Sequence, residues 1–168
     1  MTAGAARHRY LVALGSNMRH PAFGSPRAVV DAALIELDRQ FGVRAVSCVV
    51  QSAPLGPSRR RYANAAAVLA TGLAPQDMLA ALQAIERAFG RRRRGQRWGA
   101  RVLDIDLILW SGGALAAQGL QIPHPAFRER RFVLEPAAAI APCWRDPTTG
   151  LSLRQLHARL TRPRPLPR

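Results

Sequence analysis

The sequence predicts an α+β fold, in which an antiparallel or mixed sheet carries helices on both of its faces. Some short segments repeat apolar residues at period two, others repeat them at helical spacing, and the two kinds alternate along the chain. At 168 residues with 48% hydrophobic content, the chain is long enough for one well-packed core. We therefore expect a single domain over residues 1–168, with a flexible Pro/Arg tail at 161–168.

The first half of the chain is expected to form strand, helix, strand and strand. Residues 10–15 are an apolar run typical of a buried strand, and residues 26–41 have an amphipathic helical pattern that ends before a glycine. The Val-rich segment 44–52 and the Ala-rich segment 62–71 predict two further strands, separated by a Pro/Gly-rich loop at 53–58.

The second half adds a helix, a strand and two later helices. Residues 75–90 begin with proline and have an apolar stripe formed by Met78, Leu79, Leu82, Ile85 and Phe89. Residues 102–110 predict a strand with one apolar face, formed by Leu103, Ile105, Leu107 and Leu109. Short helices are expected at 132–141, which includes a proline, and at 151–160. The order β-α-β-β-α-β is typical of a ferredoxin-like sheet, with no internal repeat or linker.

Composition limits the possible chemistry. The formal charge is +15, and all 25 basic residues are arginines, so a phosphate-rich ligand or a nucleic acid is a plausible partner. The absence of lysine excludes a P-loop, a kinase-type β3 lysine and a Schiff base. Cys48 and Cys143 have no metal-binding or disulfide spacing, and no apolar run is long enough for export or a membrane span. We expect a cytoplasmic protein.

Asp104 and Asp106 are the strongest candidates for a metal site. In a strand, residues i and i+2 project from one face with Cα atoms about 6.5–7 Å apart. Two carboxylates at that spacing suit Mg²⁺, which prefers a few carboxylates together with water and phosphate oxygens. Taken alone, however, the same pair could simply face water on a half-exposed strand.

An arginine-rich segment directly precedes the aspartates: Arg91, Arg92, Arg93, Arg94, Arg97 and Arg101. Guanidinium groups bind phosphate oxygens in a bidentate manner, although an arginine run is also compatible with a solvated loop or a nonspecific nucleic-acid patch. Trp98 lies between the arginines and the aspartates, where its ring could stack on a flat ligand or have a structural role.

Three polar residues outside this segment could contact a nucleotide. Gln83 and Glu86 are one helical turn apart and could bind a ribose or a base, or form an exposed polar helix face. His124 lies between two prolines, so its imidazole could be aimed at a phosphate or could fill a turn. The residues alone leave both alternatives open.

Several motifs together resemble one family. Residues 97–108, which read RWGARVLDIDLI, are similar to the signature of the 6-hydroxymethyl-7,8-dihydropterin pyrophosphokinases. Further motifs of that family occur in the same order: ALGSN at 13–17, PLGP at 54–57, YAN at 62–64, and PHP at 123–125 followed by Arg130 and Phe132. The resemblance extends over about residues 10–156 and implies a diphosphotransferase with a ferredoxin-like fold.

The resemblance implies roles for individual residues. Asp104 and Asp106 would bind two Mg²⁺ ions, and Arg91 and Arg101 would act on the phosphates, so these four residues are the expected catalytic set. The expected ATP-binding residues are Gln83, Glu86, Arg93, Trp98, Arg101, Ile122, His124 and Arg130. The expected pterin-binding residues are Ser52, Ala53, Leu55, Tyr62, Asn64, Trp98 and Phe132, in which aromatic faces and a few polar groups suit a fused heteroaromatic ring.

The expected partners are therefore ATP and 6-hydroxymethyl-7,8-dihydropterin, for a monomeric enzyme that binds no nucleic acid and no membrane. Two other interpretations compete with this one. An RNA-binding ferredoxin-like domain would explain the charge, but its characteristic aromatic motif is missing and aromatic residues are only 6% of the chain. A catalytically silent paralogue that binds nucleotide or pterin is the third interpretation.

Overall fold

A five-stranded antiparallel sheet forms the centre of the molecule. The computed structural model describes residues 7–53, 61–90 and 102–163. The strands are β1 (His8–Ser16), β2 (Gly42–Val46), β3 (Val50–Ser52), β4 (Tyr62–Thr71) and β5 (Asp104–Trp110). Their order is β2-β4-β1-β5, with β3 paired to β4 as well, so β1 and β4 are central and β5 lies at an edge. This order and the α+β architecture confirm the predicted fold class.

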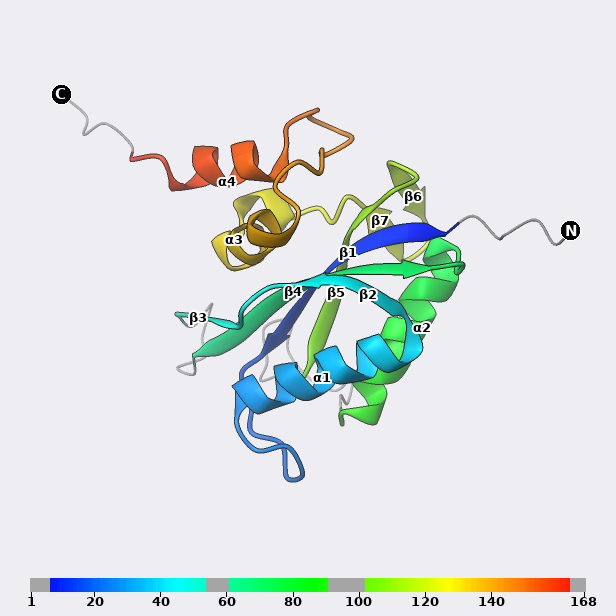
Figure 1. Ribbon diagram of the computed structural model, residues 1–168, viewed down its shortest axis with the longest axis vertical. Coiled ribbons are helices and arrows are strands. Elements are labelled where there is room, and N and C mark those ends of the chain that lie inside the picture. Colours follow the sequence, from blue (N-terminus) through cyan, green and yellow to red (C-terminus); the bar gives the residue numbers. More distant parts are fainter. Residues whose placement is uncertain (1–6, 54–60, 91–101, 164–168) are drawn as a thin grey trace, which may run out of the picture.

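Two pairs of helices cover the two faces of the sheet (Figure 1). One face carries α1 (Pro26–Gln40) and α2 (Pro75–Ala88), and the other carries α3 (Arg131–Ile140) and α4 (Leu153–Thr161). A small hairpin of β6 (Leu115–Ala117) and β7 (Leu120–Ile122) and the 3₁₀ helix η1 (Phe127–Glu129) connect β5 to α3. None of the described helices is long and apolar enough to cross a membrane.

Local capping groups explain where two of the helices begin. The Ser25 hydroxyl accepts a hydrogen bond from the Ala28 N–H, and Pro26 occupies the first turn of α1. At the start of α4, Ser152 and Gln155 form a reciprocal capping box. Such caps satisfy backbone N–H groups that have no partner within the helix.

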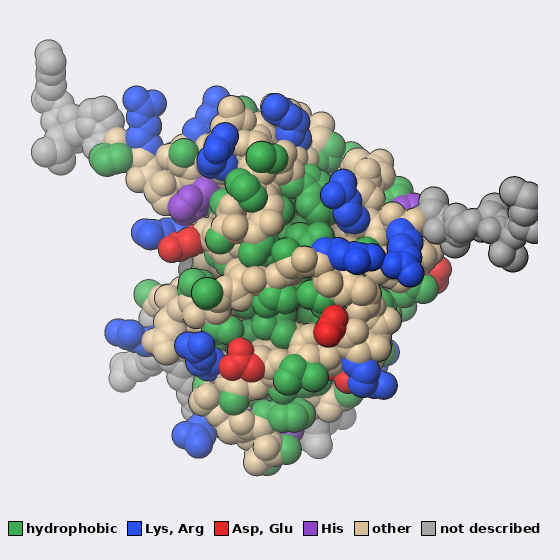
Figure 2. Space-filling model, in the orientation of Figure 1, with side chains coloured by type: hydrophobic (Ala, Val, Ile, Leu, Met, Phe, Trp, Pro, Cys, Tyr) green, Lys and Arg blue, Asp and Glu red, His purple; other side chains and the backbone are tan. Residues whose placement is uncertain are grey.

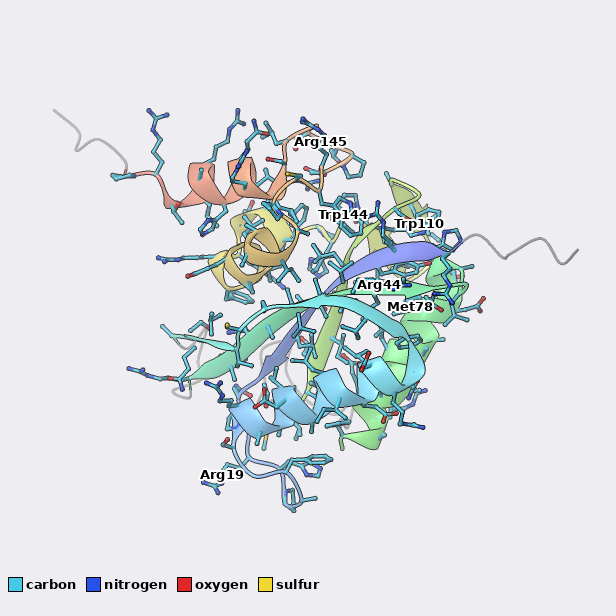
Figure 3. The ribbon with its side chains drawn as sticks, in the orientation of Figure 1. Arg19, Arg44, Met78, Trp110, Trp144 and Arg145 are labelled. Atoms are coloured by element: carbon cyan, nitrogen blue, oxygen red, sulfur yellow. The ribbon has the colours of Figure 1, made fainter. Side chains whose placement is uncertain are left out.

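The core consists of two apolar clusters, one on each face of the sheet. The cluster under α1 and α2 includes Met78 of α2, which Figure 3 labels beside the sheet, together with Ile105 and Leu107 of β5. The cluster under α3 and α4 includes Ile108 and Leu109. The predicted single apolar face of β5 is therefore wrong at Leu109, because a bulge opposite Leu11 and Val12 shifts the alternation by one residue.

Other departures from the expected elements are local. The expected strand at 44–52 is two short strands, because the Ser47 hydroxyl accepts the Ala66 N–H where the ladder is interrupted. The β6–β7 hairpin has no predicted counterpart. Thr161, assigned to the tail, is the last residue of α4, and most of the tail and of the 53–58 loop lies outside the described residues.

Candidate active site

Strand β5 presents Asp104 and Asp106 on the face of the sheet that α3 and α4 cover. Their neighbours Ile105 and Leu107 are buried in the opposite cluster, and alternate residues of a strand face opposite sides. Asp106 retains 32% of its side-chain exposure. This placement agrees with the expectation that both carboxylates share one partly solvated face.

Small residues form the floor beside the two aspartates. Ala13 of β1 pairs with Asp106, and Gly15 pairs with Asp104 on one side and with Asn64 of β4 on the other. Because neighbouring strands are about 4.8 Å apart, Asn64 and Asp104 are separated by about 10 Å across a row whose middle residue has no side chain. The sequence thus provides space between an acidic group and an amide group.

Two basic side chains lie next to Asp106. Arg130 Nη1 is 3.6 Å and His124 Nε2 is 3.8 Å from Asp106 Oδ2. Both distances exceed those of hydrogen bonds and instead describe neighbouring polar groups within electrostatic range. The structure therefore brings together three of the predicted site residues from β5, the loop after β7, and the start of α3.

The surroundings of His124 favour the neutral form of its imidazole. Burial lowers its pKa below the ordinary value; Asp106 and Asp104 oppose this effect, and Arg130 adds to it. Its Nδ1 accepts the Ala126 N–H at 3.3 Å, which places the ring proton on Nε2. The N–H group of the imidazole consequently faces the acidic centre.

The backbone also fixes His124 on β5. The His124 N–H donates to the Ile108 carbonyl at 3.0 Å. Because β5 is an edge strand, this bond uses a carbonyl on the side away from β1. The loop after β7 is thereby attached to the strand that carries the aspartates.

Glu86 is attached to the same strand. Its side chain is 3% exposed, and Oε1 accepts the N–H of Ile105, the residue between the aspartates, at 2.7 Å. A carboxylate that accepts a backbone N–H on an edge strand satisfies a donor that has no strand partner there. Glu86 therefore supports the backbone of the acidic centre, and its contact with ATP stays a prediction.

Four of the predicted pterin residues, Ser52, Tyr62, Asn64 and Phe132, lie on the same face of the sheet. Asn64 is 3% exposed, and its Nδ2 donates to the Ser52 hydroxyl at 2.9 Å. Tyr62, two residues before Asn64 in β4, shares its face by the alternation of the strand. Phe132 packs against the cluster under α3 and α4, and the Arg130 guanidinium lies 5.9 Å above its ring.

The remaining predicted site residues differ in what the structure says of them. Gln83 is half-buried on α2, Ala53 is exposed after β3, and the Ile122 side chain is 1% exposed in the core. A contact between Ile122 and ATP would thus have to use backbone atoms. The other predicted residues lie outside the described part of the chain: Leu55, Arg91, Arg93, Trp98 and Arg101.

The carboxylates of Asp104 and Asp106 suit a hard cation that takes most of its ligands from water or from a bound substrate. The described residues include no group of three or more His, Cys, Asp or Glu side chains arranged to hold a metal, which argues against a zinc-type cage in that part of the chain. Two carboxylates on one strand face are compatible with Mg²⁺, which commonly takes its other ligands from water and phosphate oxygens.

A sequence model of the 7,8-dihydro-6-hydroxymethylpterin-pyrophosphokinase (HPPK) family matches residues 11–142 of this chain. The chain belongs to this family. Among its relatives, a 2-amino-4-hydroxy-6-hydroxymethyldihydropteridine pyrophosphokinase of Pseudomonas aeruginosa is 44% identical over 142 residues, covering 83% of this chain and 84% of the relative. One of that name from Synechocystis sp. is 38% identical over 151 residues, covering 89% and 74%. The family and the resemblance inferred from the motifs agree.

Solved structures support the fold. A Plasmodium falciparum HPPK-DHPS, described with pterin and p-hydroxybenzoate, superposes with a TM-score of 0.71 at 12% identity, over 95% of this chain. The present chain spans 45% of that solved chain, which is less than half of its length. At this identity the likeness bears on the fold, and it confirms the ferredoxin-like architecture of the HPPK family.

Two features next to the site were not predicted as functional. The ALGSN motif was identified in the sequence, but the position of Ala13 and Gly15 beside the two aspartates was not predicted. Small residues at i and i+2 in a buried strand are the sequence pattern that indicates such a floor. The second feature is an ion pair between Arg128 and Asp146. Eighteen residues separate the two, so no local pattern connects them.

Proposed function

We propose that the acidic centre on β5 is where this chain catalyses the reaction of its family, with Asp104 and Asp106 as the Mg²⁺ ligands. The family transfers pyrophosphate from ATP to 6-hydroxymethyl-7,8-dihydropterin in folate synthesis. The observation that carries the proposal is the convergence of His124 and Arg130 on Asp106, beside the small residues Ala13 and Gly15 of the neighbouring strand β1.

The reaction is an in-line displacement. The hydroxymethyl oxygen of the pterin attacks the β-phosphorus of ATP, the bond from the β-phosphorus to the α,β-bridging oxygen breaks, and AMP leaves with that oxygen. The hydroxyl proton passes to solvent or to a phosphate oxygen. Two Mg²⁺ ions held by Asp104 and Asp106 would supply charge neutralisation for the phosphates and order the reacting oxygens.

The basic residues of the site bind and stabilise the phosphate groups. The Arg130 guanidinium and His124 Nε2 face the acidic centre, where phosphate oxygens would lie close to Asp104 and Asp106. Arg91 and Arg101 are assigned to the transferring phosphates, and Arg93 to ATP, because of their place in the family motif. Phosphoryl-type transfer requires positioning and charge stabilisation more than a protein nucleophile.

The pterin is assigned to the Asn64 side of the floor. Tyr62 and Phe132 supply aromatic faces, and the Ser52–Asn64 pair supplies fixed polar groups for the edge of the ring. The roughly 10 Å between Asn64 and Asp104 is compatible with a ring bound beside the acidic centre. Its hydroxymethyl group can then point toward the aspartates.

We further propose that residues 1–168 work as one monomeric pyrophosphokinase domain in the cytoplasm, with ATP and the pterin as ligands and no nucleic acid. One sheet joins both core clusters, which supports the single domain. Light scattering of the purified protein with and without both ligands tests the monomer directly.

The function is tested by measuring AMP release from ATP and Mg²⁺ with and without 6-hydroxymethyl-7,8-dihydropterin, with mass detection of the pterin product. We expect pterin-dependent AMP and a pterin diphosphate. Asp106→Asn should reduce turnover by about 10²- to 10³-fold, because removal of one essential electrostatic group costs this much in other sites. An exposed carboxylate on α1 provides the matched control, Asp38→Asn.

The outcomes separate the competing functions. A folded Asp106→Asn protein with normal turnover would refute the assignment of the acidic centre. Tight binding of RNA without any AMP would favour the RNA-binding alternative, and pterin or nucleotide binding without transfer would favour a silent paralogue.

A further inference from the structure

We propose that the Arg128–Asp146 ion pair is a positioning device for the reaction, because it fixes η1 so that His124 and Arg130 face Asp106. The inference rests on the proposed function of the acidic centre. Arg128 and Asp146 pair with each other and not with Asp104 or Asp106. They would therefore act through His124 and Arg130, the two basic side chains that lie next to Asp106.

The pair has the geometry of a rigid connection. Arg128 Nε and Nη2 donate to Asp146 Oδ2 and Oδ1, both at 2.8 Å. This fork-shaped contact fixes the orientation of the guanidinium as well as its distance. The Asp146 side chain is completely buried, and that of Arg128 is 27% exposed.

Asp146 is itself held by its own loop. Its carboxylate accepts the Thr149 hydroxyl at 2.6 Å and the Thr148 N–H at 3.1 Å. Its backbone N–H donates to Leu151, and its carbonyl accepts from Gly150. The loop begins after Trp144 and Arg145, which Figure 3 labels on the α3–α4 side of the sheet, and it provides a fixed support for Arg128.

The short segment around η1 transmits this support to the site. The Phe127 N–H donates to the His124 carbonyl at 3.2 Å, and the Arg130 N–H donates to the Phe127 carbonyl at 3.3 Å. The Phe127 ring is fully buried beneath Arg128, whose guanidinium lies 4.8 Å from the ring centre. A shift of Arg128 would therefore move Arg130, two residues further along the chain, relative to Asp106.

The presence of an ion pair, rather than an apolar contact, at Arg128 and Asp146 also supports a positioning role. A buried charge pair gains little net stability over an apolar pair of similar volume, because both ions lose their hydration. A bidentate pair does, however, specify one geometry, and small displacements near reacting groups reduce rates strongly. The Arg128–Asp146 pair thus contributes mainly a fixed orientation of η1 relative to the loop that carries Asp146.

The test compares Asp146→Asn and Arg128→Lys with the wild-type full chain in the AMP assay. At a temperature where each variant is folded by circular dichroism, we expect kcat/KM for ATP to fall by about 10- to 100-fold, as for other residues that orient ligands without touching substrate. The KM for the pterin should stay unchanged. Glu135→Gln, which breaks the exposed Arg131–Glu135 pair of α3, is the matched control and should have no effect.

A double-mutant cycle separates positioning from general destabilisation. In an Arg130→Ala background, Asp146→Asn should cause a clearly smaller further loss than in the wild type, because one of the two side chains through which it acts is gone. An equal loss in both backgrounds, or full activity of folded Arg128→Lys, would overturn the proposal. If Asp146→Asn does not fold, Arg128→Lys supplies the same cycle.

Hydrogen exchange keeps this inference distinct from the proposed function. Amides of residues 124–130 should exchange faster in Asp146→Asn than in the wild type, whether or not the protein transfers pyrophosphate. Unchanged exchange there would overturn the bracing role even in an active enzyme. Absence of transfer by the wild-type protein would instead refute the proposed function.

Discussion

At the scale of single residues, the site depends on small side chains as much as on charged ones. Gly15 pairs with both Asn64 and Asp104, and a Cβ built on Gly15 would lie 3.4 Å from Asn64 Oδ1, an ordinary contact distance. An alanine can therefore be accommodated, whereas a larger side chain would occupy the floor. The glycine is required for space and not for an unusual backbone conformation.

Gly15→Val tests this interpretation. Valine suits a strand, so we expect a folded protein in which kcat/KM for the pterin falls by about tenfold or more, equivalent to about 1.4 kcal/mol. Gly15→Ala is the control and should remain within about twofold of wild type. Steady-state kinetics at saturating ATP measure both variants, and equal activity of the valine variant would show that the floor is not in contact with substrate.

The buried carboxylate of Asp146 predicts a dependence of stability on pH. Burial alone would raise its pKa, but hydrogen bonds from Arg128, Thr149 and Thr148 outweigh burial and lower the pKa. The lowered pKa means that the folded state favours the ionised form, so the contribution is present above the unfolded value of about 3.9 and disappears as the pH falls through the folded value.

Asp146→Asn should accordingly destabilise the protein by about 2 kcal/mol at neutral pH, the scale of a lost charged hydrogen bond. The difference from wild type should begin to shrink as the pH falls below about 3.9, because the unfolded wild-type chain is protonated there, and should disappear as the pH falls through the lower folded value. Urea unfolding at several pH values measures this difference. A gap that stays constant down to acidic pH would contradict the assigned role of the charge.

At the scale of elements, β5 is held on its outer edge by two different contacts. Glu86 of α2 accepts the Ile105 N–H, and the Ile108 carbonyl accepts the His124 N–H. The sheet contributes only the inner edge, where β5 pairs with β1. The positions of Asp104 and Asp106 thus depend on a helix and a loop in addition to the ladder.

Substitutions of Glu86 distinguish backbone support from nucleotide binding. Glu86→Gln keeps an oxygen acceptor and should retain most activity, whereas Glu86→Leu leaves the Ile105 N–H without that acceptor and should cost about 1–3 kcal/mol of stability. The leucine variant should also need more Mg²⁺ for half-maximal activity, as magnesium titrations can measure. A direct ATP contact would instead raise the KM for ATP in both variants.

The sequence predicted elements best where one periodicity continued without interruption. Segment 62–71 coincides with β4, and the apolar stripe that α2 begins lies in the core or packs against it, as expected. The prediction for Leu109 was wrong because a bulge breaks period two, and such a bulge depends on the partner strand. The break at Ser47 likewise depends on a contact with Ala66 in another strand.

The same distinction applies to the site. The spacing of Asp104 and Asp106 predicted that they share one face of a strand, and the geometry of β5 agrees. The family motifs predicted ligand-binding roles for Asn64, His124 and Arg130, and these roles remain proposals. Glu86 was identified as a polar residue on a helix, but its backbone partner is known only from the fold. Contacts between distant segments leave no local pattern in a sequence.

At the scale of the whole molecule, charge is the dominant property. The chain carries a formal charge of +15, and Figure 2 shows arginine side chains over all layers of the face in view. A positively charged protein attracts the polyanion ATP over a distance that shortens as salt is added. The pterin has no phosphate and should not experience this attraction.

Added salt should therefore affect the two substrates differently. Raising NaCl from about 0.05 M to about 0.5 M shortens the screening length from about 14 Å to about 4 Å. We expect kcat/KM for ATP to fall severalfold, while kcat/KM for the pterin at saturating ATP changes little. Initial rates at fixed Mg²⁺ measure this, and an equal decrease for both substrates would point to a general effect of salt on the enzyme.

The contacts that cover the outer edge of β5 also affect how the sheet avoids fibril formation. An unpaired strand edge can recruit the edge of another molecule and start a continuous intermolecular sheet. The edge next to the aspartates is occupied by Glu86 and by the loop at His124, whereas the opposite edge, β2, exposes Arg44. The contacts that shape the site thus also prevent the β5 edge from pairing with a strand of another molecule. At the β2 edge, repulsion between the Arg44 side chains of two molecules disfavours the same pairing.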